Sequence, residues 1–87
     1  MYETPKQIYG IYVTEYRNGG AISWIDYMFW YKLKDAQKAL AKFVEGYASS
    51  EFAIPGSGYE YLNNECAVVY VNGEKRFEYR IMHFGIL

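Results

Sequence analysis

The sequence predicts an α+β fold, a two-layer sandwich in which one α-helix lies across one face of an antiparallel sheet made of two β-hairpins. Two Asn-Gly pairs, each between strand-forming segments, predict the hairpins, and an apolar stripe at helical spacing between them predicts the helix. The expected element order is therefore β-β-α-β-β. We expect a single domain over residues 1–87, because a second domain would be too small to hold a core.

The first hairpin is predicted from residues 6–16 and 21–31, which are rich in Ile, Val, Thr and aromatic side chains. Asn18-Gly19 between them tolerates the positive φ angles of a two-residue type I′ turn. The register that follows from this turn pairs Val13 with Trp24, Ile11 with Asp26 and Tyr9 with Met28.

Side chains alternate between the two faces of a strand, so each face of this hairpin has its own set. The face expected to meet the helix carries Tyr9, Ile11, Val13, Ile22, Trp24, Met28 and Trp30, with Glu15 and Asp26 among them. The other face is rich in tyrosine and carries Tyr12, Thr14, Tyr16, Ser23, Ile25, Tyr27, Phe29 and Tyr31.

The helix is predicted from Leu33 onward, where the hydrophobic period changes. Its apolar stripe comprises Leu33, Ala36, Ala39, Leu40, Phe43, Val44 and Tyr47. Asp35 suits the positive end of the helix dipole, and Gly46 is the expected end, with one further turn through Tyr47 as the alternative. We expect the stripe to pack on Ile11, Val13, Trp24 and Trp30.

The second hairpin is predicted from residues 65–71 and 74–84, joined by a type I′ turn at Asn72-Gly73. Residues 49–58 are expected to be loop, and residues 59–62 either a short strand or extended chain. The expected register places Cys66, Val68, Phe77, Tyr79 and Ile81 on the apolar face and Glu74, Arg76, Glu78 and Arg80 on the charged face. The apolar end of the chain, residues 83–87, is expected to be packed.

No motif in the chain carries a specific chemistry, so we expect a protein that is not an enzyme and needs neither metal nor cofactor. Cys66 and His83 are too few for a structural zinc site, and a lone cysteine forms no intramolecular disulfide. The loop from Pro55 to Gly58 lacks the Lys-Ser/Thr that follows a phosphate-binding loop. The catalytic alternative is a site built around Asp26, with Glu15 and His83.

The charge balance argues against two kinds of partner. Nine Lys and Arg against ten Asp and Glu give a net charge of −1, which is not typical of proteins that bind nucleic acid or an anionic membrane surface. No apolar run has transmembrane length, and residues 1–5 show no secretion signal. The expected location is the cytoplasm.

Aromatic side chains supply the candidate binding site. Eleven Tyr, five Phe and two Trp make 21% of the chain, more than so small a core can bury, so aromatic surface is expected in an interface. The same excess, with the apolar chain end, predicts a two-fold homodimer. The candidate partner-binding residues are Tyr12, Tyr16, Tyr27, Phe29 and Tyr31, and the rival is a basic surface of Lys34, Lys38 and Lys42.

As a short, motif-free, tyrosine-rich and slightly acidic chain, the sequence resembles small proteins encoded by phages and mobile elements that bind a host protein, anti-CRISPR proteins among them. This resemblance implies a non-catalytic inhibitor that blocks a host protein sterically, in the host cytoplasm. One alternative is an oligomeric binder of a small ligand or nucleotide that stacks against the aromatic sheet face. A structural or assembly subunit is another.

Overall fold

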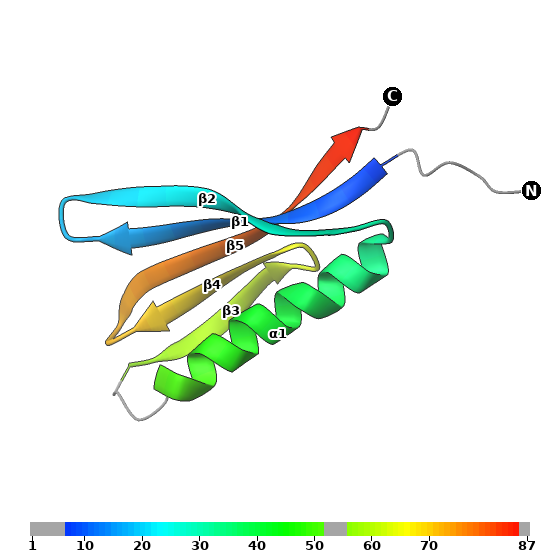
Figure 1. Cartoon of the computed structure of the whole chain (residues 1–87). Helices are drawn as coiled ribbons and strands as arrows, with labels where there is room; N and C mark the ends of the chain where they lie inside the picture. The colour runs from blue at the N-terminus through cyan, green and yellow to red at the C-terminus, as the bar shows by residue number, and fades with distance from the viewer. Residues whose placement is uncertain (1–6, 52–55, 86–87) are drawn as a thin grey trace, which may run out of the picture.

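The computed structural model describes residues 7–51 and 56–85, with the side chains of Tyr27 and of residues 47–51 outside the description. It has one five-stranded antiparallel sheet and one helix lying across one face, which confirms the predicted α+β class (Figure 1). The elements are β1 (Gln7–Arg17), β2 (Gly20–Trp30), α1 (Leu33–Glu51), β3 (Gly58–Asn63), β4 (Cys66–Val71) and β5 (Glu74–Gly85). Residues 59–62, for which the sequence allowed either a short strand or extended chain, thus belong to a strand, β3.

The two predicted hairpins form one sheet because β1 pairs with β5, giving the strand order β2-β1-β5-β4-β3. On the face away from the helix, Tyr12 lies beside Arg80 and Thr14 beside Glu78. The tyrosine-rich face of the first hairpin therefore continues into charged residues of the second, as the sequence predicted. The same order makes β2 and β3 the two edges of the sheet.

The first hairpin keeps the predicted register only near its turn. Val13 pairs with Trp24 as expected, but an irregularity between Gly10 and Tyr12 then shifts the pairing, and Tyr9 faces Trp30. The predicted pair Tyr9–Met28 is therefore wrong, and the predicted pair Ile11–Asp26 falls in the irregular stretch, outside the regular pairs. Because β2 gains two residues relative to β1, its side chains stay on their predicted faces.

Only one of the two Asn-Gly turns is of type I′. Asn72 and Gly73 both have positive φ, 56° and 77°, as a type I′ turn requires. In the first turn Gly19 has a φ of 86°, but Asn72 is the one described non-glycine residue with positive φ, so Asn18 does not. The signs of φ at Asn18 and Gly19 fit a type II turn.

The second hairpin has an extra residue in β5, and this overturns the predicted face of β4. Tyr70 pairs with Lys75 but Val69 with Phe77, so Arg76 is the additional residue. A one-residue shift turns every later side chain to the other face. Cys66 therefore faces Arg80 and Val68 faces Glu78, while Ala67 and Val69 face the helix.

The core lies between α1 and the middle of the sheet. Ala36, Leu40 and Val44 of the predicted stripe are buried, with Leu33, Ala39 and Phe43 packed beside them. Their partners on the sheet are Ile11, Val13, Ala67, Val69, Phe77, Tyr79 and Ile81. The predicted stripe is confirmed from Leu33 to Val44, while the side chain of Tyr47 lies outside the description. The helix passes Gly46 and ends at Glu51, since an interior glycine costs only about 1 kcal/mol.

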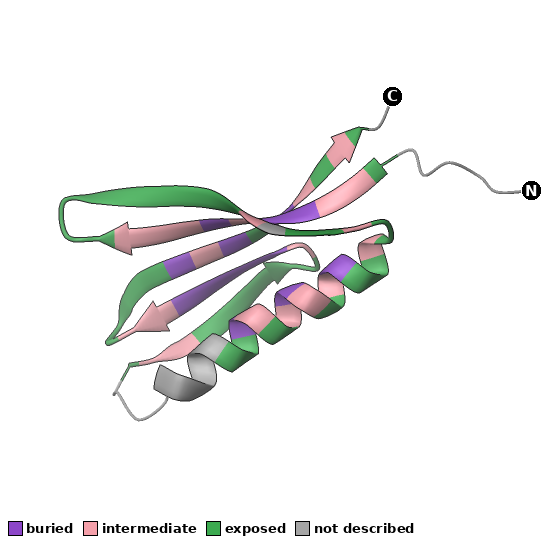
Figure 2. Ribbon diagram, in the orientation of Figure 1, coloured by how far each residue is buried: buried purple, intermediate pink, exposed green. Residues whose placement is uncertain are grey.

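The helix covers the central strands and leaves the edges open. Strands lie about 4.8 Å apart and a helix with its side chains is about 10–12 Å wide, so one helix covers two to three strands. The predicted packing of Trp24 under the helix is accordingly wrong, because Trp24 is exposed on β2. Figure 2 shows the buried residues on α1 and the central strands, with β2 exposed along most of its length. The chain end, residues 86–87, lies outside the described residues.

Candidate protein-binding surface

Strand β2 carries a row of exposed apolar side chains along a free edge of the sheet. Five of its large apolar side chains are 41–48% exposed, and Tyr31, just after the strand, is 70% exposed. These residues, which we call the β2 surface, are Ile22, Trp24, Ile25, Met28, Phe29 and Tyr31. So much apolar area on one strand is typical of an interaction site.

The β2 surface has two sides. On the helix side, Ile22 lies opposite Glu15 and Trp24 opposite Val13, with Met28 farther along the strand. On the open side, Ile25 lies opposite Tyr12 and Phe29 opposite Gly10. A partner at this edge therefore meets apolar side chains above and below the plane of the sheet.

Phe29 is held in place although it is half exposed. Its ring meets that of Phe84 edge-on, with the centroids 6.0 Å apart. Both rings lie over Gly10, where a Cβ atom would come within 3.1 Å of Phe29 Cε1 and 3.2 Å of Phe84 Cε2. Glycine at this position thus lets two rings close over the strand, and the fixed ring loses little conformational freedom when a partner binds.

On the helix side a groove of about 440 Å³ separates β2 from α1. Its apolar lining comes from Met28, Trp30, Ala39 and Phe43. Asp35, Lys38 and Lys42 complete the lining. Two members of the predicted basic surface thus border the β2 surface, while Lys34 is exposed without lining the groove.

The structure places the predicted tyrosine set unevenly. Phe29 and Tyr31 are exposed, Tyr12 and Tyr16 are half-buried, and the side chain of Tyr27 lies outside the described residues. Lys75 Nζ lies 4.9 Å from the centroid of the Tyr16 ring. Sequence reasoning missed Ile22, Trp24 and Met28, which it assigned to the core, and no local pattern marks them as exposed.

Lys75 contacts Glu78 as well as Tyr16. Its Nζ donates a hydrogen bond of 3.2 Å to Glu78 Oε1. Burial alone would lower the pKa of Lys75, but the hydrogen bond and charge of Glu78, with a smaller effect of Tyr16, raise it. The lysine therefore stays charged beside the ring of Tyr16.

The opposite edge, β3, has a smaller exposed group made of Tyr59, Tyr61 and Leu62. Tyr61 donates a hydrogen bond of 3.3 Å from its hydroxyl to Glu45 Oε1 on α1. Burial and the negative charge of Glu45 together raise the pKa of Tyr61. This ring is therefore engaged with the helix.

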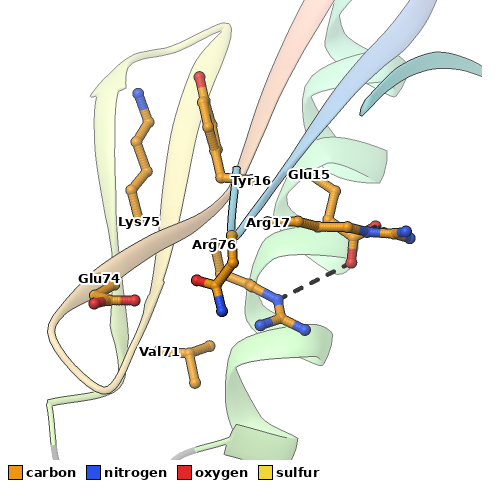
Figure 3. Close-up of a pocket in the computed structure, with 8 residues that line it drawn as sticks. Glu15, Tyr16, Arg17, Val71, Glu74, Lys75 and Arg76 are labelled. Carbon is orange, nitrogen blue, oxygen red and sulfur yellow. Dashed lines mark hydrogen bonds and ion pairs between the residues drawn. The ribbon is translucent and has the colours of Figure 1, made fainter. Parts of the chain in front are cut away.

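A polar cavity of about 430 Å³ lies where the tips of the two hairpins meet (Figure 3). Glu15 accepts hydrogen bonds from Arg17 Nη2 at 2.7 Å and Nε at 3.0 Å, and its other oxygen lies 4.0 Å from Arg76 Nε. One carboxylate thus pairs with both arginines. This arrangement explains how Glu15 sits on the helix-facing side of the sheet, and its single negative charge offsets one of the two positive charges of the arginines.

The residues of the catalytic alternative do not come together. His83 lies opposite Tyr9 and Glu15 lies opposite Phe77, so the two are six positions apart along β1, about 20 Å. His83 instead contacts the Glu65 carboxylate, and its ring meets that of Tyr9 edge-on. Asp26 lies at the irregular part of β2, where its Oδ2 atom is buried without a hydrogen-bond partner among the described residues.

Cys66 is also separated from His83. It faces Arg80 on the open side of the sheet, whereas His83 follows Tyr79 and Ile81 on the helix side. The thiol is buried, which suits a small hydrophobic role. Across the described ranges, no three His, Cys, Asp or Glu residues are grouped so as to hold a metal ion.

Comparison with known proteins gives no match, whether with family models, curated proteins or solved structures. Within the part of the chain that the structure describes, no helix is long and apolar enough to cross a membrane.

Proposed function

We propose that this protein is a non-catalytic protein-binding module that holds its partner through the β2 surface. The observation that supports this proposal most directly is the exposure of five large apolar side chains, 41–48% each, on one edge strand. Keeping them in water has a cost of roughly 25 cal/mol per Å² of apolar area, which binding would recover. Aromatic anchors such as Trp24 and Phe29 are the side chains that most often dominate protein interfaces.

The form of this function that the sequence profile favours is inhibition by steric block. A small module held by one strand covers part of a larger protein and keeps a substrate or a moving segment away from it. A protein of the cell that hosts a phage or mobile element would be such a target. Lys38 and Lys42 beside the groove would favour a target that is acidic next to its apolar patch.

The test begins with identification of the partner by affinity capture from the native host and mass spectrometry. Binding of the purified partner is then measured by calorimetry for Trp24→Ala and Phe29→Ala. Each change should weaken binding by about 2 kcal/mol or more, because each removes an aromatic anchor. Leu62→Ala is the matched control, since Leu62 is 53% exposed on the opposite edge strand.

Lys38→Glu separates the apolar from the electrostatic contribution. It should weaken binding chiefly at low salt, because an exposed charge is screened as the ionic strength rises. If the Trp24 and Phe29 variants fold and bind as well as the unchanged protein while the Leu62 variant fails, the assignment of the site to β2 is wrong.

A further inference from the structure

We infer that β2 pairs antiparallel with β2 of a second copy of this chain, across a two-fold axis centred on Ser23. The product is one continuous sheet of ten strands, twice the five of a single protomer, with both helices on the same side. This inference rests on the proposed function and deepens it, because it names a second copy of this chain as a protein that binds the β2 edge.

The edge of β2 lacks most of the features that keep sheet edges apart. An outer antiparallel strand turns the N–H and C=O of every second residue toward solvent, ready to pair with another strand. Lysine, arginine and proline, which usually discourage such pairing, are missing from its sequence GAISWIDYMFW, and Asp26 is its sole charged residue. The strand is also long, with 11 residues.

One irregularity limits where a second strand can pair. Three residues of β2, positions 26–28, lie opposite Ile11 between the regular pairs Tyr12–Ile25 and Gly10–Phe29. A bulge of this kind interrupts the ladder of hydrogen bonds on the free side as well. The regular segment that remains available is residues 20–25.

The alternation of faces then selects the register. Residues opposed across a two-fold axis must lie on the same side of the sheet, so the axis passes through a residue of β2 and not between two residues. With the axis at Ser23, Ile22 faces Trp24 of the second copy on the helix side. On the open side Ala21 faces Ile25 of the second copy, so each large side chain meets a smaller one.

Neighbouring registers fit less well. An axis at Ile22 places Ile25 opposite the turn residue Gly19, and an axis at Trp24 places Ile22 opposite the carboxylate of Asp26. An axis at Ile25 requires pairing across the bulge. An axis at Asp26 opposes two like charges, which destabilises a strand pair.

The area available is sufficient for a specific but modest dimer. A large apolar side chain offers on the order of 200 Å² when fully exposed, so each of Ile22, Trp24 and Ile25 still has roughly 80–100 Å² to bury. With the two backbone edges and the flanking side chains, the pair would bury on the order of 1,000 Å² in total, near the lower limit for specific interfaces. We therefore expect a dissociation constant of roughly 1–100 µM.

Sedimentation velocity of the full chain over a wide range of concentrations tests the dimer. The expected result is a shift from monomer to dimer mass within this range, and a monomer throughout would overturn the inference. Trp24→Lys and Ile25→Lys change opposite sides of the strand, and each should weaken the dimer at least tenfold. Leu62→Lys on β3 is the control and should leave it unchanged; loss of the dimer in this variant alone would overturn the inference.

Ser23→Cys tests the register independently of dimer strength. In the proposed register, the new thiol of one protomer lies opposite the same thiol of the second protomer. Mild oxidation should therefore join the two protomers covalently, within the geometry of a cross-strand disulfide. Asn64→Cys, in the exposed turn between β3 and β4, should form no covalent dimer under the same oxidation, and equal cross-linking of both variants would refute the register. If the chain is a monomer while Trp24→Ala still weakens binding to a captured partner, the dimer is wrong and the proposed function stands.

Discussion

Replacing Gly56 with alanine should destabilise the protein strongly, although Gly56 is exposed. Its φ is +81°, a left-handed conformation that disfavours residues with a Cβ atom. A Cβ built there would lie 2.7 Å from the backbone nitrogen of Gly73 and 3.1 Å from the carbonyl carbon of Asn72. The neighbours are backbone atoms of the β4–β5 turn, so no side chain can rotate away to make room.

The magnitude follows from three contributions. A non-glycine residue in the left-handed region costs about 1–2 kcal/mol. The carbonyl of Gly56 accepts a hydrogen bond of 2.9 Å from the Gly73 N–H, and its loss costs about 0.5–1.5 kcal/mol. With the steric displacement added, the free energy of unfolding should fall by about 2–4 kcal/mol, a large part of the roughly 5–15 kcal/mol of an ordinary domain.

Thermal unfolding followed by circular dichroism measures this effect. For a chain of this size the melting temperature should fall by roughly 10–25 °C. Gly58→Ala is the matched control, because a Cβ there has no atom within 4 Å and its φ lies outside the left-handed region. The control should change stability by no more than about 0.5 kcal/mol. Equal melting temperatures for the two variants would refute the reasoning.

Three further predictions concern the core, the bulge and the β3 edge. Leu40→Ala should cost about 2–5 kcal/mol in urea unfolding and more than Phe43→Ala, because Leu40 is 1% exposed whereas Phe43 is only partly buried; the reverse order would contradict the described core. Asp26→Val should stabilise the protein by about 1–3 kcal/mol, since it removes a buried oxygen that has no partner among the described residues, and a loss of stability would show that the carboxylate supports the bulge. Glu45→Gln should lower the raised pKa of Tyr61, as measured by NMR titration of its ring, because it removes the negative charge beside the hydroxyl while leaving the burial unchanged.

The sign of the Tyr61 effect on stability follows from the direction of its shift. A pKa raised in the folded state means that folding favours the protonated hydroxyl. This contribution is fully present below the ordinary pKa of tyrosine and is lost as the pH rises through the raised value. The Glu45→Gln variant should therefore lose less stability than the unchanged protein over that alkaline range.

The sequence by itself determined the features that depend on local backbone geometry. The alternation of Ile22, Trp24 and Met28 with Ser23, Ile25 and Phe29 is preserved, and the stripe of Ala36, Leu40 and Val44 is buried as predicted. The position of a turn at each Asn-Gly pair also follows from those two residues, although only Asn72-Gly73 has the positive φ at both residues that a type I′ turn requires. Each of these features has a fixed period or φ requirement that a short stretch of sequence reveals.

The tertiary structure alone decided the registers and the exposure of the β2 surface. The additional Arg76 in β5 turns Cys66 and Val68 to the open face, and no local signal distinguishes this bulge from a regular strand. Trp24 lies on the apolar face of its strand whether that face is buried or exposed. Whether that face is buried depends on where its strand lies in the sheet, and one helix is too narrow to cover a sheet of five strands. Because β1 pairs with β5, β2 lies at the edge, and its apolar face is left for a partner.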